Sequence, residues 1–191
     1  MAIIIPADLT IVTLRRGDLE LPQRWTAEHA VAVLLHASGL LKAHANIEFP
    51  LGTCEQVVDT MPSGGATDAV DEAGYDFLAA SYKAGDGIRV LLVDRVVEGE
   101  LGAQSRRQTR VCVIAHGSDL GATSRMLAHE LGHLLALPHV DSGRRPEHAP
   151  HDQTWTRNLM YSGTLSRSAE LTPTQVQAAR SSPLARRFGG R

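Results

Sequence analysis

The residues of this chain best suited to chemistry are three histidines and a glutamate in the segment 129–139, HELGHLLALPH. His129 and His133 are four residues apart, so on an α-helix both imidazoles lie on the same face, one turn apart. Two imidazoles in this arrangement can bind one metal ion. Glu130 follows the first histidine and projects beside the metal, where a general base for a water molecule is required.

The chain is predicted to leave the helix just after this pair. Leu137 precedes Pro138 and therefore avoids the α region, and proline lacks the N–H that a continuing helix needs. We expect the chain to turn back here, so that His139 supplies a third nitrogen ligand. Three protein ligands with one open position are typical of catalytic zinc, whereas structural zinc sites are usually closed by four ligands.

Residues 124–137 are predicted to form the buried amphipathic helix that presents these ligands, with Thr123 or Ser124 capping its start. The faces that the ligands leave free carry apolar residues: Met126, Leu127, Leu131, Leu134 and Leu135. The alternative is a core helix whose histidines are merely hydrogen-bonded. That helix would bury three imidazoles and a carboxylate with no partner to offset their lost hydration, so we favour the metal site.

This segment resembles the signature of the metzincin zinc endopeptidases, H-E-x-x-H-x-x-G-x-x-H followed by a methionine turn. The resemblance is sharp over 124–161, where Asn158-Leu159-Met160-Tyr161 matches the turn, and it extends more softly to the whole chain. It implies one catalytic zinc ion above a methionine floor. By position, it assigns the zinc ligands to His129, His133 and His139, the catalytic base to Glu130 and the floor to Met160.

Two positions characterise this chain within the family. The family's glycine, which ends the helix in a left-handed conformation, is Ala136 here, and a left-handed alanine costs on the order of 1 kcal/mol. Tyr161 directly follows Met160, as in matrixins and many small bacterial pappalysin-like enzymes. In the members whose tyrosine reaches the metal, that tyrosine comes one residue later. We therefore interpret Tyr161 as a half-buried neighbour of the turn, and not as a ligand.

The hydrophobic pattern predicts an α+β (mixed α/β) fold, a twisted mixed sheet stacked on two helices and followed by an irregular C-terminal part. Helices are expected at 27–44 after the cap Thr26, at 69–82, at the zinc segment and at 173–181. Strands are expected at 8–15, from Asn46 to Phe49 and over the following few residues, at 88–96 and at 109–115. The rest of 52–87 is expected to be loop-rich. We expect a single catalytic domain over 1–191, with an N-terminal subdomain to about 139 and a C-terminal subdomain from about 140 that contains the methionine turn and the final helix.

The resemblance also implies where a substrate lies. In metzincins the strand matching 109–115 is the antiparallel edge of the sheet and lines the cleft. Val111, Val113 and Ala115 would then flank a peptide that binds as an additional strand.

The pocket for the side chain just after the scissile bond is bounded, in these enzymes, by the zinc helix and the segment after the methionine turn. Leu134 and Leu165 favour a mainly apolar pocket here. An inward-pointing Arg167 would instead select an acidic side chain; we favour a solvated Arg167, because an unpaired buried guanidinium is costly.

Composition excludes some classes of partner. A net charge of −2 and a pI near 6.5 give no electrostatic reason to expect nucleic acid or an anionic membrane. We expect a monomer that acts on protein or peptide substrates. No signal peptide or membrane-spanning stretch is visible, so a mature secreted form and a cytoplasmic or leaderless-export protein both remain open.

Neither the cysteines nor the acidic cluster predicts a further site. Cys54 and Cys112 allow at most one disulfide, and their pairing is left open. A calcium ion is possible in related enzymes near the acidic residues of the central region, but the spacing here matches no calcium loop. These residues are Asp59, Asp68, Asp71, Glu72 and Asp76.

The sequence thus predicts a zinc-dependent endopeptidase in which Glu130 moves the proton of a metal-activated water molecule. One alternative is an inactive zinc-binding recognition module, which only Ala136 supports. Another is a two-histidine site completed by a distant glutamate such as Glu170, which we disfavour because Glu170 precedes a helix start instead of lying in a helix.

Overall fold

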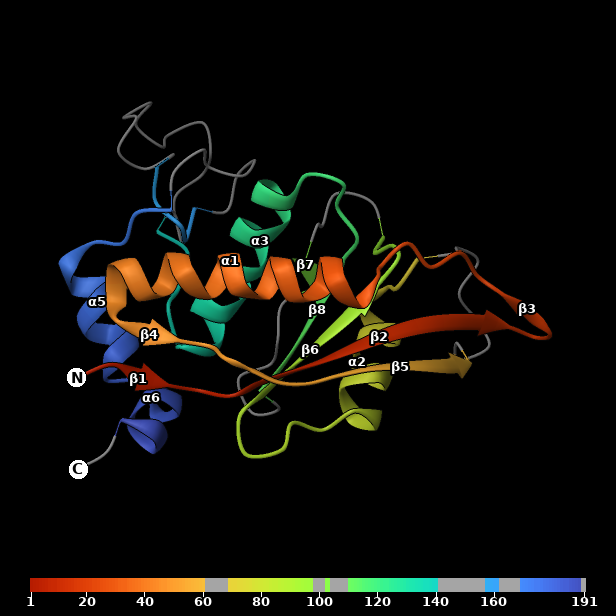
Figure 1. Ribbon diagram of the computed structural model, residues 1–191, viewed down its shortest axis with the longest axis horizontal. Coiled ribbons are helices and arrows are strands. Elements are labelled where there is room, and N and C mark those ends of the chain that lie inside the picture. The colour runs from red at the N-terminus through yellow and green to blue at the C-terminus, as the bar shows by residue number, and fades with distance from the viewer. Residues whose placement is uncertain (61–68, 98–101, 104–109, 141–156, 162–168, 190–191) are drawn as a thin grey trace.

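The centre of the molecule is a twisted mixed β-sheet with helices on both faces (Figure 1). The computed structural model describes residues 1–60, 69–97, 102–103, 110–140, 157–161 and 169–189. The combination of helices with a mixed sheet confirms the α+β prediction.

Four parallel strands form the body of this sheet, in the spatial order β5, β2, β6, β8. Their bounds are β2 Ala7–Arg16, β5 Leu51–Thr60, β6 Ile88–Val93 and β8 Val111–Ala115. Two short strands are antiparallel to their neighbours, namely β3 (Leu19–Glu20) on the end of β2 and β7 (Gly102–Ala103) on β8. A separate parallel pair joins β1 (Ile3–Ile4) to β4 (Ile47–Glu48).

The pleat of the strands divides the core into two clusters, because successive side chains point to opposite faces. On one face, Leu9 and Ile11 of β2 pack with α1 (Ala27–Ala45) and α3 (Leu120–Leu134). On the other face, Val12 and Leu14 pack with α2 (Glu72–Ser81). The sheet is therefore stacked on two helices as predicted, with α2 added on the opposite side (Figure 1).

The long first helix agrees closely with its prediction. Thr26 caps α1, and its side chain accepts the N–H of His29 at 3.1 Å. Its buried residues include Val33, Leu34, Ala37 and Leu41, whereas Leu40 is half-buried. The helix at 69–82 is also confirmed; its buried residues include Tyr75, Leu78 and Ala79, whereas Phe77 is 36% exposed.

Two helices close the described chain. The predicted helix at 173–181 is confirmed as α5 (Pro173–Arg180), and a short α6 (Pro183–Phe188), which we did not predict, follows it. Arg180 donates hydrogen bonds to the carbonyls of Ala45 and Met1 at 2.8 and 3.1 Å, which places both termini at the same end of the molecule (Figure 1). None of the helices in the described residues is both long and apolar enough to cross a membrane.

The strand β5 contradicts the prediction of a loop-rich region from residue 52. It pairs with β2 from Leu51 to Thr60, yet none of its residues is fully buried. Only Cys54 and Val57 of β5 pack, half-buried, against the two core clusters, so its sequence LGTCEQVVDT shows no apolar alternation by which a strand is recognised.

The assignment of residues 109–115 as the antiparallel edge strand was wrong. β8 is parallel to β6 on one side and paired with β7 on the other, so it lies inside the sheet. Val111 and Val113 are completely buried in the cluster that contains α2, on the face away from α3. Ala115 is 6% exposed, and its alternation with Val113 places it on that same face. In the described residues, the outer position beyond β8 belongs to β7.

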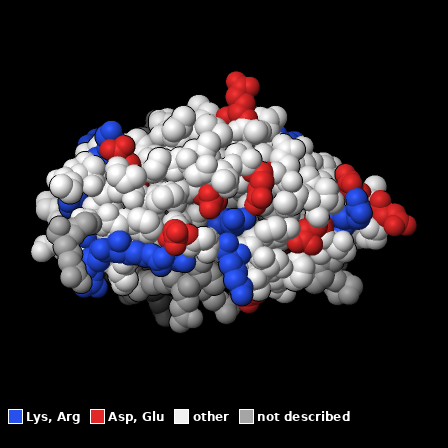
Figure 2. Space-filling view, turned by 60° about the horizontal axis from the view of Figure 1, so that its bottom comes forward, with Lys and Arg blue, Asp and Glu red and all other residues white. Residues whose placement is uncertain are grey.

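Charged side chains of both signs are interspersed on the face shown in Figure 2. Many of the cations have a carboxylate close by, as in the pairs Arg89–Glu55 at 2.7 Å, Lys42–Glu48 at 3.1 Å and Arg187–Asp86 at 3.2 Å. Such exposed pairs each contribute little to stability.

Candidate metal centre

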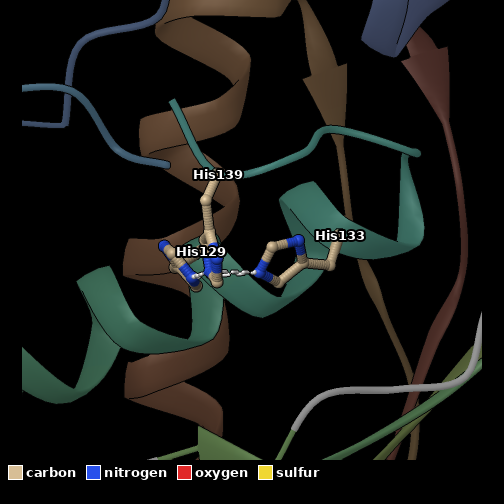
Figure 3. Close-up of side chains that lie close together, drawn as sticks. All are labelled: His129, His133 and His139. Atoms are coloured by element: carbon tan, nitrogen blue, oxygen red, sulfur yellow. Dashed lines mark hydrogen bonds between the residues drawn. The ribbon is translucent and has the colours of Figure 1, made fainter. Parts of the chain in front are cut away.

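Three imidazoles converge on one point beside α3 (Figure 3). His129 and His133 project from successive turns of the helix, and His139 returns to them after the helix has ended. The Nε2 atoms of His129 and His133 are 3.1 Å apart, and His139 Nε2 lies 3.2 and 3.0 Å from them. Spacing along one helix predicted the first two positions, and the turn after the helix supplies the third.

Backbone carbonyls fix which nitrogen of each helical imidazole carries the proton. His129 Nδ1 lies 2.7 Å from the oxygen of Leu159, and His133 Nδ1 lies 2.9 Å from that of Leu137. A carbonyl oxygen only accepts, so each neutral imidazole donates from Nδ1 and keeps its lone pair on Nε2. Two lone pairs facing each other repel unless a cation lies between them, and this group can therefore hold a metal ion.

A left-handed residue turns the chain at the end of α3. Ala136 has φ 66°, its N–H donates to His133 O at 2.9 Å, and the N–H of Leu137 donates to Gly132 O at 3.0 Å. This pair of bonds is the Schellman motif, in which the left-handed position is usually glycine. The prediction of a left-handed Ala136 is confirmed. The helix ends at Leu134, earlier than the predicted 137, because this turn precedes the proline.

Replacing Ala136 by glycine is expected to stabilise the protein by about 0.5–1 kcal/mol. A left-handed alanine costs about 1–2 kcal/mol, which glycine would relieve. The greater conformational freedom of glycine in the unfolded chain reduces this gain in stability by about 0.4–1 kcal/mol. The measurement is the free energy of unfolding from urea titration of both proteins. A loss of stability in Ala136→Gly would contradict the conformation described here.

The start of α3 differs from the prediction. Its cap is Asp119, whose side chain accepts the N–H of Ala122 at 2.6 Å. Thr123 and Ser124, the predicted caps, lie inside the first turns and donate their hydroxyls to the carbonyls of Asp119 and Leu120. The sequence offered several capping residues in a row, and propensity alone does not choose among them.

The turn matched to the methionine turn holds His129 in place. Tyr161 N–H donates to Asn158 O at 3.2 Å and closes the turn, while Leu159 N–H donates to Glu170 O at 2.8 Å. The carbonyl of the same Leu159 accepts from His129. Met160 is completely buried and Tyr161 is half-buried, as expected for both.

An amide pair that we did not predict connects this turn to α5. Asn158 Nδ2 donates to Gln175 Oε1 at 2.8 Å, and Gln175 Nε2 donates back to Asn158 Oδ1 at 3.1 Å. Asn158 Oδ1 also accepts the N–H of Met160, and Gln175 completes a capping box with Thr172. The spacing T-P-x-Q indicates the capping box in the sequence. The bonds of Gln175 to Asn158 can be recognised only in the folded chain.

Gly132, inside the metal helix, is another functional residue that the sequence analysis missed. A Cβ at this position would lie 2.5 Å from Met160 Sδ and 3.2 Å from its Cε. The absence of a side chain therefore allows the methionine to pack directly against the helix between the two ligands. Glycine in a helix interior is unfavourable. A glycine in the middle of the predicted helix was therefore the sequence feature that could have indicated a close contact at this position.

Replacing Gly132 by alanine is expected to destabilise the protein by about 1–3 kcal/mol, the usual cost of overpacking a core. At an open helix position the same change stabilises by up to about 1 kcal/mol, so the sign of the effect reports the Met160 contact. Gly39, inside α1, provides the matched control, because a Cβ added there would meet nothing within 4 Å. Gly39→Ala is expected to stabilise, and equal effects at both sites would contradict the packing.

Glu130, the residue after His129, is buried, with 5% of its surface exposed. Burial, and then the negative charge of Glu130, raise the pKa of the Cys112 thiol well above its usual value. Cys112 therefore stays a neutral thiol and does not act as a nucleophile. It does not pair with Cys54 either: both are free, and β2 and β6 separate their strands by three strand spacings of about 4.8 Å, beyond disulfide reach.

The remaining candidates lie elsewhere or have structural roles. Glu170, the alternative third ligand, is exposed and lies outside the histidine group. Leu134 packs in the main core, while Leu165 and Arg167 fall outside the described residues. Of the acidic residues considered for calcium, Asp71 caps α2, Asp59 accepts the hydroxyl of Tyr82, and Asp68 falls outside the described residues.

The comparisons with known proteins add no family assignment. The sequence matches no protein-family model and no curated protein. What supports a metal centre is therefore the geometry of His129, His133 and His139.

Proposed function

We propose that this protein is a zinc-dependent endopeptidase of the metzincin type, in which Glu130 acts as general base and general acid. The observation that carries this proposal is the convergence of the Nε2 atoms of His129, His133 and His139 at 3.0–3.2 Å. Glu130, which follows His129 in the chain, supplies a buried carboxylate at the position that the resemblance assigns to the catalytic base.

The donor set supports zinc among the metals. Zinc–nitrogen bonds of about 2.0–2.1 Å in a tetrahedral site place two ligand nitrogens about 3.3–3.4 Å apart, close to the separations of 3.0–3.2 Å found here. The set contains no thiolate, since Cys112 and Cys54 lie on the strands β8 and β5. Three neutral imidazoles that leave one position open are typical of catalytic zinc, and carbonyl partners on Nδ1 orient two of them.

The chemistry divides between the ion and Glu130. Zinc, when bound, supplies a Lewis acid that lowers the pKa of water towards neutrality and polarises a peptide carbonyl. Glu130 takes the proton of the attacking water and gives it to the leaving amine. Met160 packs against Gly132 of α3 and takes no part in proton transfer.

A peptide substrate is proposed to bind along β7, which takes the place that the resemblance gave to 109–115. β7 is antiparallel to β8 and lies beyond it at the outer side of the sheet, in the part of the chain that the structure describes. An unpaired strand edge offers backbone donors and acceptors to an extended peptide.

The alternative of an inactive recognition module gains no support from Ala136. The left-handed alanine keeps both hydrogen bonds of the helix end, and His139 still reaches the other two imidazoles. We therefore retain the enzyme as the single proposal.

The test is digestion of a denatured protein and of an unbiased peptide library by the purified, zinc-loaded protein. We expect cleavage at internal peptide bonds that a chelator abolishes and added zinc restores. Mass spectrometry of the products distinguishes internal from terminal cleavage. A zinc-loaded protein that cleaves neither substrate would overturn the proposal in favour of recognition.

A further inference from the structure

One stripe of α3 is accessible, and it leads to the metal centre. Between residues 121 and 133 of this otherwise buried helix, the half-buried residues are Gly121, Ala122, Arg125 and His129. Residues four apart lie one above another on a helix, so Gly121, Arg125 and His129 form a single line. Arg125 is the one charged group of that line and lies one turn before His129.

The guanidinium of Arg125 lacks a partner in the described chain. Its Nε is buried and has no hydrogen-bond acceptor there, and no carboxylate of the described residues forms an ion pair with it. The Nε atoms of Arg15 and Arg89 are also buried without an acceptor, but a terminal nitrogen of each binds a carboxylate at 2.7 Å. Arg125 differs from both in this respect.

The nearby acidic side chain of Asp119 is engaged elsewhere. Its Oδ1 accepts the N–H of Ala122 at 2.6 Å as the cap of α3. A partly buried guanidinium that no carboxylate contacts directly is unfavourable. Because no carboxylate of the described residues pairs with Arg125, a ligand that reaches the histidines along this accessible line can supply its counter-ion.

The position of Arg125 sets the distance at which this ligand group must lie. Four residues of helix rise about 6 Å, and a helical side chain points towards the N-terminus. In agreement, Arg125 Nη1 would lie 3.4 Å from a Cβ built on Gly121. An extended peptide advances about 3.3 Å per residue, so the group contacted lies about two to four residues from a bond cut at the metal.

We propose that Arg125 binds a carboxylate of the peptide substrate, either an Asp or Glu side chain near the cut or the C-terminal carboxylate. The guanidinium offers two parallel N–H donors, which match the two oxygens of a carboxylate. This inference rests on the proposed peptidase function and names its substrate class. It differs from the mainly apolar pocket expected from the sequence and assigns acid selection to Arg125, not to Arg167.

The experiment uses pairs of quenched fluorescent peptides cut at a known bond. One set compares Glu with Gln at each of four positions on either side of that bond, and the other compares a free C-terminus with its amide. We expect the wild-type protein to cleave the acidic member about 10- to 100-fold more efficiently, as for a charge-assisted hydrogen-bonded pair. The set that shows this difference identifies the source of the carboxylate.

Arg125→Gln is expected to cleave both members of each pair equally, and Arg125→Lys to keep part of the preference. Arg186→Gln, an exposed cation in the last turn of α6, is the matched control and should retain the full preference. Bound zinc and the melting temperature, measured for each variant, confirm that it is folded. A preference that survives in Arg125→Gln, or no preference in the wild-type protein, would overturn the inference.

A binding measurement separates this inference from the proposed function. The affinities of the same peptides are measured by fluorescence anisotropy on Glu130→Gln, with and without Arg125→Gln. Tighter binding of the acidic peptide that depends on Arg125 supports the inference, even for a protein that cleaves nothing. Equal binding of acidic and neutral peptides contradicts it, whatever the outcome of the cleavage test.

Discussion

Replacing Glu130 by glutamine is expected to leave about one zinc ion per chain and to lower kcat/KM for peptide cleavage by at least roughly 10²–10⁴-fold. Glutamine has nearly the shape of glutamate, so the buried position, 5% exposed in this fold, stays filled. The amide cannot accept a proton from water, and attack on the peptide carbonyl loses its base. Glu130 is not among the three residues that could hold the ion. The measurements are initial rates on a quenched peptide and metal content by mass spectrometry.

The matched control for this change is Glu28→Gln, an exposed glutamate in the first turn of α1. It removes the same charge away from the histidines and should leave both zinc content and kcat/KM within about twofold, as for most surface substitutions. An active Glu130→Gln protein would show that the base is another group. Loss of zinc together with activity would show that Glu130 helps to hold the ion.

The histidine group of the candidate metal centre was predictable because its information is local. His129 and His133 need only the periodicity of one helix, and His139 needs only the break at the end of that helix. The buried helix follows from the apolar pattern of residues 124–137 and the left-handed Ala136 from the metzincin resemblance, and both agree with the structure. Errors at this level were confined to the ends of α3, where Asp119 and the Schellman turn define boundaries that propensity does not resolve.

The sheet edge and the support of the site were not predictable, because they depend on residues far apart in the chain. β7 has two residues, too few for any periodicity, so the edge was assigned to the next strand. Asn158 and Gln175 are 17 positions apart. Asn158 bonds within its own turn and Gln175 within its own helix cap, so neither residue by itself indicates a bond to the other. The contact of Gly132 with Met160 joins the helix to the turn. Such pairs become visible only when the fold brings them together.

Removing two ligands is expected to have the largest effect on metal binding. The double variant His129→Ala, His133→Ala should fall from about one zinc ion per chain to near zero after dialysis, since a single imidazole remains. Zinc at about 1,000 times its dissociation constant stabilises the folded wild-type protein by about 4 kcal/mol. This corresponds to roughly 8–16 °C in melting temperature for a chain of this size, and the double variant should show no such shift.

Single variants then decide the third ligand. His139 Nε2 lies 3.2 and 3.0 Å from the other two ligand nitrogens, whereas Glu170 is exposed. His139→Ala should therefore weaken zinc binding by at least about 10-fold, at the level found for disrupted metal sites, while Glu170→Gln should leave it unchanged. His36→Ala, an exposed histidine of α1, controls for loss of an imidazole elsewhere. Near-full zinc occupancy in the double variant, or a dominant effect of Glu170→Gln, would show that other residues hold the ion. The convergence of His129, His133 and His139 would then serve only packing.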